Sequence, residues 1–201
     1  MLPNGFVFLD DIMTEIEWDA KYAGCDNFMG RPADGYRANR IVCTCEMAFA
    51  LQIAQAEFQK KGYSVFAFDA YRPARAVRDF VKWVYDDTDQ KRKNIHYPNI
   101  DKRSMLTDGY IAEKSGHSRG STIDLTLKKD GKFVDMGGIF DYMDELSHTL
   151  SEKITPEQRK NRLILRDIML NAGFTDYHAE WWHFRLKNEP YPDTYFDFPI
   201  E

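Results

Sequence analysis

Cysteine is scarce in this chain of 201 residues, which has only Cys25, Cys43 and Cys45. An odd number of thiols cannot all pair, and Cys43 and Cys45 lie too close in sequence for an ordinary disulfide or a zinc-binding pair. We therefore expect free thiols and a reducing compartment, which favours a cytoplasmic protein. A chain of this length can bury an adequate core without disulfides.

Long apolar runs and basic blocks are also missing. Residues 1–10 have no basic stretch and only a short apolar run, so they predict neither a signal peptide nor a membrane span. The net charge is -5 and no Lys/Arg cluster stands out, which argues against nucleic acid or an anionic membrane as a partner. No repeat or linker divides the chain, so residues 1–201 are expected to form one domain, as a monomer or a homodimer.

Hydrophobic periodicity predicts strands interrupted by helices. Period-two alternation or short apolar runs predict strands at 16–22, 63–68, 121–127 and 179–186. Helical spacing and end signals predict helices over 44–61, 73–85 and 155–172. Asp130-Gly131 predicts a hairpin turn after the third strand. This mixture indicates an α+β fold rather than a barrel of repeating βαβ units.

Two histidines and an aspartate suggest a metal site. Asp124 lies within an apolar strand, where a carboxylate is costly unless it is paired or binds a metal. Gly120 would let the chain bend so that His117 and Asp124 face one ion. With His183 they supply three ligands that zinc accepts, and a fourth position then remains for water, as in catalytic zinc sites. Glu180, which is surplus to the ligands, becomes the candidate proton acceptor of a metallohydrolase.

Each of these residues also has a plainer interpretation. A lone His117 is more often a hydrogen-bonded histidine, and residues 180–183 could form an aromatic core strand with solvated ends. Residues three apart on a regular strand point to opposite faces, so Glu180 must lie at a bulge or just before the strand. His178 remains a rival ligand. A serine hydrolase is disfavoured, because the chain has no Gly-x-Ser-x-Gly motif.

Arg72 follows the second predicted strand and precedes Pro73, which begins a predicted helix. This position would hold a guanidinium rigidly at the end of a sheet, where it could stabilise the oxyanion formed when water adds to a carbonyl. The alternative is a simple ion pair with Asp69. The sequence leaves both interpretations open.

The motif SGHSRGSTIDLTL at 115–127, together with EWWHF at 180–184, resembles the zinc D-alanyl-D-alanine dipeptidases of the VanX type, in peptidase family M15. Gly116 is one departure, because a similar member of that family has a second serine there. Further matching segments follow in order along nearly the whole chain, at 18–22, 26–28, 34–36, 69–73, 97–101, 140–145 and 189–199.

The resemblance implies a central, mostly antiparallel sheet with flanking helices, as in zinc D,D-peptidases and the hedgehog signalling domain. It implies hydrolysis of the free dipeptide D-Ala-D-Ala by zinc-activated water. The implied roles are zinc ligation by His117, Asp124 and His183; general base and acid catalysis by Glu180; support of the tetrahedral intermediate by Arg72; ammonium binding by Tyr22 and Asp141; and carboxylate binding near Ser115. The alternatives are a D,D- or L,D-carboxypeptidase with an open groove, or a non-catalytic zinc domain of the same fold.

Overall fold

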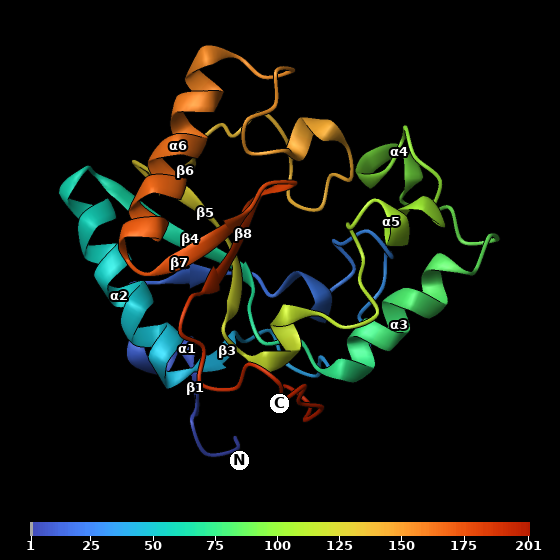
Figure 1. The fold of residues 1–201 in the computed structure, drawn as a ribbon, viewed down its shortest axis with the longest axis horizontal. Coiled ribbons are helices and arrows are strands. Elements are labelled where there is room, and N and C mark those ends of the chain that lie inside the picture. Colours follow the sequence, from blue (N-terminus) through green and yellow to red (C-terminus); the bar gives the residue numbers. More distant parts are fainter. Residues whose placement is uncertain (1) are drawn as a thin grey trace.

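The computed structural model describes residues 2–201, and its centre is a six-stranded sheet (Figure 1). The strand order is β2-β4-β5-β8-β7, with β6 paired to β5. The β2–β4 pair is parallel, whereas β4–β5, β5–β6, β5–β8 and β7–β8 are antiparallel. The strands span Glu17–Trp18 (β2), Tyr63–Asp69 (β4), Thr122–Lys129 (β5), Lys132–Phe133 (β6), Phe174–Tyr177 (β7) and Glu180–Leu186 (β8). The predicted α+β class and mostly antiparallel sheet are confirmed.

Two long helices, α2 (Cys45–Lys60) and α6 (Pro156–Asn171), lie together against one face of the sheet, and α3 (Ala74–Val84), α4 (Lys93–His96) and α5 (Ser104–Thr107) lie beyond the other (Figure 1). A smaller two-stranded ladder pairs β1 (Phe6–Phe8) with β3 (Val42–Thr44). The short helical elements are α1 (Leu9–Ile12), η1 (Lys21–Ala23), η2 (Gly116–Arg119) and η3 (Glu145–Ser147). The buried apolar side chains form one continuous cluster. Among residues 2–201, no helix has the length and apolar character needed to cross a bilayer.

The helix boundaries follow from local end signals, as predicted. The Thr44 side chain accepts a hydrogen bond from the Met47 amide at the start of α2, and Thr155 forms a capping box with Gln158 at the start of α6. Pro73 differs slightly from the prediction. It is the N-cap of α3 rather than its first helical residue, so the helix begins at Ala74.

The strand predicted over 16–22 is wrong beyond Trp18. The main chain leaves the sheet there because the Asn39 side-chain oxygen accepts the Ala20 amide proton, at 2.8 Å, so this group does not bond to a neighbouring strand. Tyr22 then lies in the 3₁₀ helix η1. The apolar alternation reflected burial rather than strand geometry, since Ala20 and Tyr22 are buried all the same.

The strands β5 and β8 set the positions of the chemically important side chains. Asp124 on β5 pairs directly with His183 on β8. The β7–β8 pairing is irregular, with Tyr177 opposite Glu180 but Asp176 opposite Phe184. The extra residues bulge out of β8, which lets Glu180 and His183 reach the same side of the strand. Of the two placements predicted for Glu180, at a bulge or just before the strand, the irregular pairing agrees with the bulge.

Candidate active site

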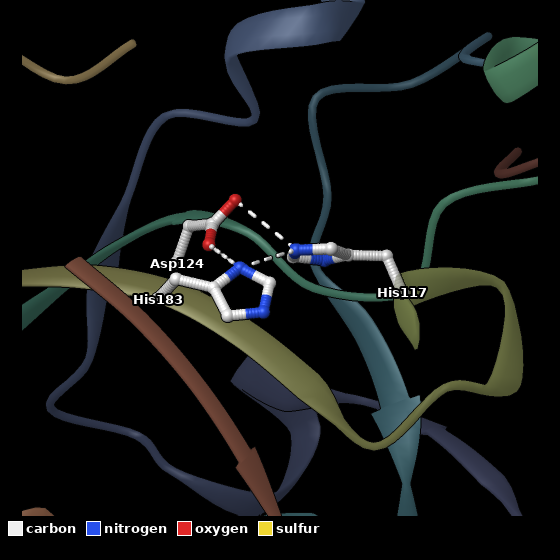
Figure 2. Close-up of side chains that lie close together, drawn as sticks. All are labelled: His117, Asp124 and His183. Carbon is white, nitrogen blue, oxygen red and sulfur yellow. Dashed lines mark hydrogen bonds and ion pairs between the residues drawn. The ribbon is translucent and has the colours of Figure 1, made fainter. Parts of the chain in front are cut away.

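His117, Asp124 and His183 come from three elements and converge on one point (Figure 2). His117 Nε2 lies 3.3 Å from Asp124 Oδ2 and 3.3 Å from His183 Nδ1, and His183 Nδ1 lies 3.1 Å from Asp124 Oδ1. All three candidate ligand atoms lie within 4.8 Å of one another. The structure thus brings together the three residues that the sequence predicts as ligands.

Gly120 makes the turn that joins η2 to β5. Its φ of +84° is in the left-handed region, and a Cβ built there would lie 2.3 Å from the Phe6 ring. A side chain is therefore excluded both by strain and by lack of space. The predicted bend at Gly120 is confirmed, and it carries the chain from His117 into β5 and Asp124.

The protonation states of these groups suit metal binding. His117 Nδ1 lies 2.7 Å from the Ala70 carbonyl oxygen, which can only accept, so Nδ1 carries the proton and Nε2 offers its lone pair. Burial lowers the pKa of His117, and the nearby Arg72 lowers it further. Burial alone would raise the pKa of Asp124, but its contacts with His117 and His183 lower it below its usual range. A neutral His117 and an ionised Asp124 are in the forms that bind metal.

Glu180 adjoins this cluster without being part of it. Its Oε2 lies 3.5 Å from His183 Nδ1, and its side chain is only 14% exposed. Burial raises the pKa of Glu180 well above its ordinary value, as do the charges of Asp124 and Asp141, while Arg72 opposes them. A raised pKa makes this carboxylate a stronger proton acceptor than an ordinary glutamate.

Arg72 makes the ion pair with Asp69 that was one of its two interpretations, and it also lies close to Asp124. Its Nε donates to Asp69 Oδ2 at 3.0 Å, which is the ion pair, and its terminal nitrogen lies 3.4 Å from Asp124 Oδ2. The Tyr36 hydroxyl donates to the other Asp69 oxygen at 2.6 Å. Arg72 is therefore held rigidly and still reaches the ligand cluster.

Asp141 and Tyr22 form a second polar pair. The Tyr22 hydroxyl donates to Asp141 Oδ2 at 2.8 Å, and both side chains are buried. Burial raises the pKa of Asp141 to about 8, assisted by the charge of Asp124 and opposed by the Tyr22 hydrogen bond and by Arg72. A cationic group that binds beside this buried carboxyl would stabilise its ionised form.

All eight residues predicted for the site line one cavity of about 350 Å³. They are Tyr22, Arg72, Ser115, His117, Asp124, Asp141, Glu180 and His183. Ser115 is also the N-cap of η2, where its hydroxyl accepts the His117 amide proton. The rival ligand His178 lines a different cavity, beside His148.

Sequence reasoning missed part of the cavity wall. Tyr110, Lys114 and Tyr177 line it as well, and the Tyr177 hydroxyl donates to the Gly109 carbonyl at 3.2 Å. This bond ties the segment between α5 and η2 to β7. No local pattern marks these residues, because the contact joins positions 68 apart in the sequence.

Comparisons with known proteins identify the family of the chain. The family model described as D-ala-D-ala dipeptidase, Peptidase_M15, matches residues 3–201. A D-alanyl-D-alanine dipeptidase of Enterococcus faecium is 49% identical over 199 residues, covering 98% of each chain. One from Streptomyces coelicolor is 48% identical over 201 residues, covering 99% of this chain and 100% of the relative.

The solved vancomycin-resistance D,D-dipeptidase VanXYg, in complex with a D-Ala-D-Ala phosphinate analogue, is a more distant match. It shows 17% identity and a TM-score of 0.39, covering 77% of this chain and 54% of that chain, which is too weak to bear on the fold or the site. The family model and the two relatives span almost the full length of the chain. The chain therefore belongs to the D-Ala-D-Ala dipeptidases of peptidase family M15, a family of metal-dependent hydrolases.

Proposed function

We propose that this protein hydrolyses the free dipeptide D-Ala-D-Ala to two molecules of D-alanine with the help of one zinc ion. The proposal rests mainly on the cavity of about 350 Å³. It is lined by the cluster of His117, Asp124 and His183, by Glu180, and by the Tyr22–Asp141 pair. Its volume is at the small end of ligand sites, as a dipeptide requires. The relatives named D-alanyl-D-alanine dipeptidase support the assignment.

His117 Nε2, a carboxylate oxygen of Asp124 and His183 Nδ1 would hold the zinc ion. Two imidazole nitrogens and one carboxylate are a donor set that catalytic zinc accepts. When bound, zinc supplies Lewis-acid chemistry, which lowers the pKa of a bound water and polarises a carbonyl. The Ala70 carbonyl, by accepting the Nδ1 proton of His117, fixes the tautomer that this ligation needs.

Proton transfer falls to Glu180. Its carboxylate takes a proton from the water whose oxygen bonds to the peptide carbonyl carbon, and it returns that proton to the departing nitrogen as the C–N bond breaks. The raised pKa of Glu180 suits both steps. Arg72, held by Asp69 at 3.0 Å, donates to the oxygen that becomes negative in the tetrahedral intermediate.

The two charged ends of the dipeptide supply specificity. Asp141, with the Tyr22 hydroxyl beside it, holds the ammonium, and the neighbourhood of Ser115 holds the carboxylate. The Tyr177–Gly109 hydrogen bond ties down one wall of the cavity, which favours a short substrate over the cell-wall peptide that a carboxypeptidase needs. The free cysteines support the predicted cytoplasmic location.

Acetylation of the substrate's amine tests this assignment. N-acetyl-D-Ala-D-Ala should have a kcat/KM at least roughly 10²-fold below that of D-Ala-D-Ala, because it lacks the charge partner of Asp141 and adds bulk. The assay compares these two compounds with L-Ala-L-Ala and the depsipeptide D-Ala-D-lactate. Comparable kcat/KM values for the free and acetylated dipeptides would favour a carboxypeptidase, and no turnover of any compound by zinc-loaded protein would favour a non-catalytic domain.

Replacing Arg72 by lysine keeps the charge but removes the forked donor. We expect kcat to fall by about 10²-fold with a smaller change in KM, since the proposed partner oxygen carries full charge only near the transition state. Affinity for a phosphinate analogue should fall in parallel with kcat/KM. Thermal melting controls for the loss of the ion pair with Asp69. Unchanged phosphinate affinity in a folded variant would contradict the role of Arg72.

A further inference from the structure

The backbone at Asp141 needs an explanation. Asp141 has a φ of +57°, and in residues 2–201 only Asp130 shares a positive φ among the non-glycine residues. Asp130 lies in the hairpin turn between β5 and β6, where that conformation is usual. Asp141 lies outside any hairpin, so the surrounding structure must hold it in this conformation.

His96, at the end of α4, makes the contacts that hold the turn. Its Nδ1 lies 3.1 Å from the Asp141 carbonyl oxygen, and its own carbonyl accepts the Met143 amide proton at 2.7 Å. The His96 side chain is buried, with 4% exposed. The two hydrogen bonds fix the main chain at Asp141 and at Met143. In this conformation the Asp141 carboxyl faces the Tyr22 hydroxyl.

Arg92 determines which nitrogen of His96 carries the proton. Its terminal nitrogen lies 3.3 Å from His96 Nε2, and a guanidinium can only donate, so Nε2 accepts and Nδ1 donates to Asp141. Burial lowers the pKa of His96 to about 4, with a further lowering by Arg92, so the ring is neutral at pH 7. Arg92 is itself held by Asp26, at 2.8 Å, and Asp26 also pairs with Lys21, the neighbour of Tyr22. One polar chain thus reaches both members of the Tyr22–Asp141 pair.

We infer that His96 is a positioning residue that aims the Asp141 carboxyl at the substrate's ammonium. The inference rests on the proposed function, which assigns the ammonium to Asp141. His96 does not line the cavity, so it acts only through Asp141. Its loss should therefore weaken substrate binding and leave the proton transfer by Glu180 intact.

Three substitutions of His96 test the inference. His96→Leu removes the donor, His96→Gln places an amide near the position of Nε2, and His96→Asn places an amide donor near the position of Nδ1. We expect His96→Leu and His96→Gln to raise KM for D-Ala-D-Ala by roughly tenfold with little change in kcat, and His96→Asn to restore KM. His148→Leu, at a half-buried histidine outside the cavity, is the matched control and should leave KM unchanged.

Crystal structures of the variants provide a readout independent of turnover. In His96→Leu, Asp141 should leave the left-handed conformation and lose the Tyr22 hydrogen bond, whereas both features should persist in His96→Asn. An unchanged Asp141 in His96→Leu, or equal KM values for all three variants, would overturn the inference. Asp141→Asn tests the underlying assignment separately: if its KM matches the wild type while the His96→Leu structure shows Asp141 displaced, the positioning stands and the ammonium assignment fails.

Discussion

Glu180→Gln is expected to lower kcat by about 10²- to 10⁴-fold while the protein stays folded and retains its metal. The glutamine keeps the shape of the side chain but cannot accept a proton from water. Glu180 is not one of the three clustered ligands, and its nearest approach to them is the 3.5 Å contact with His183 Nδ1. Steady-state kinetics together with metal analysis of the same sample measures both halves of the prediction.

The control for this variant is Glu145→Gln. Glu145 is an exposed carboxylate that lines a different cavity, and its replacement should leave kcat unchanged. A near-native kcat for Glu180→Gln would show that the base lies elsewhere. His178, two residues earlier in the chain, would be the first alternative to examine, although it lines a different cavity from Glu180.

His117→Ala is expected to weaken metal binding severely and to abolish turnover at low zinc concentration. The variant keeps only two of the three proposed ligands. Changes to residues that merely support a ligand cost about 10- to 100-fold in metal affinity, so removal of a ligand itself should lower the affinity by more than about 10²-fold. It also leaves the buried Asp124 carboxylate without one of its two histidine partners. Zinc content after dialysis against a metal buffer, measured alongside the melting temperature, tests the prediction without relying on activity.

His178→Ala is the matched histidine control, and it should retain one zinc per chain. If His117→Ala bound zinc as tightly as the wild type and His178→Ala did not, the ligand set would have to include His178. Recovery of turnover in His117→Ala at high zinc concentration would fit the prediction, because the remaining ligands, Asp124 and His183, still face one another.

The helices were predictable because their end signals are local. Thr155-Pro156 before α6 supplies a cap and a preset backbone, and Gly62 just after α2 adopts the positive φ of +78° that ends a helix. The end of β2 was not predictable in this way. It depends on the Asn39 side-chain oxygen, which accepts a hydrogen bond from the Ala20 amide, and the two residues are 19 positions apart in the sequence.

The chemistry of the site was likewise visible in the residue types. A carboxylate in an apolar strand, two histidines in polar and aromatic motifs, and a surplus glutamate predicted His117, Asp124, His183 and Glu180, and the structure brings all four to one cavity. Sequence alone could also say that Glu180 needed a bulge or a position just before the strand, because strand geometry has a period of two.

Only the tertiary structure decided how these groups are held. The pairing of Asp124 with His183 depends on strand register, and the hydrogen bond from His96 to the Asp141 carbonyl joins residues 45 positions apart in the sequence. Neither contact leaves a local pattern, because each depends on how distant segments pack. The sequence by itself therefore determined which groups are present and their chemistry, whereas packing decided their distances, their protonation and the cavity that they share.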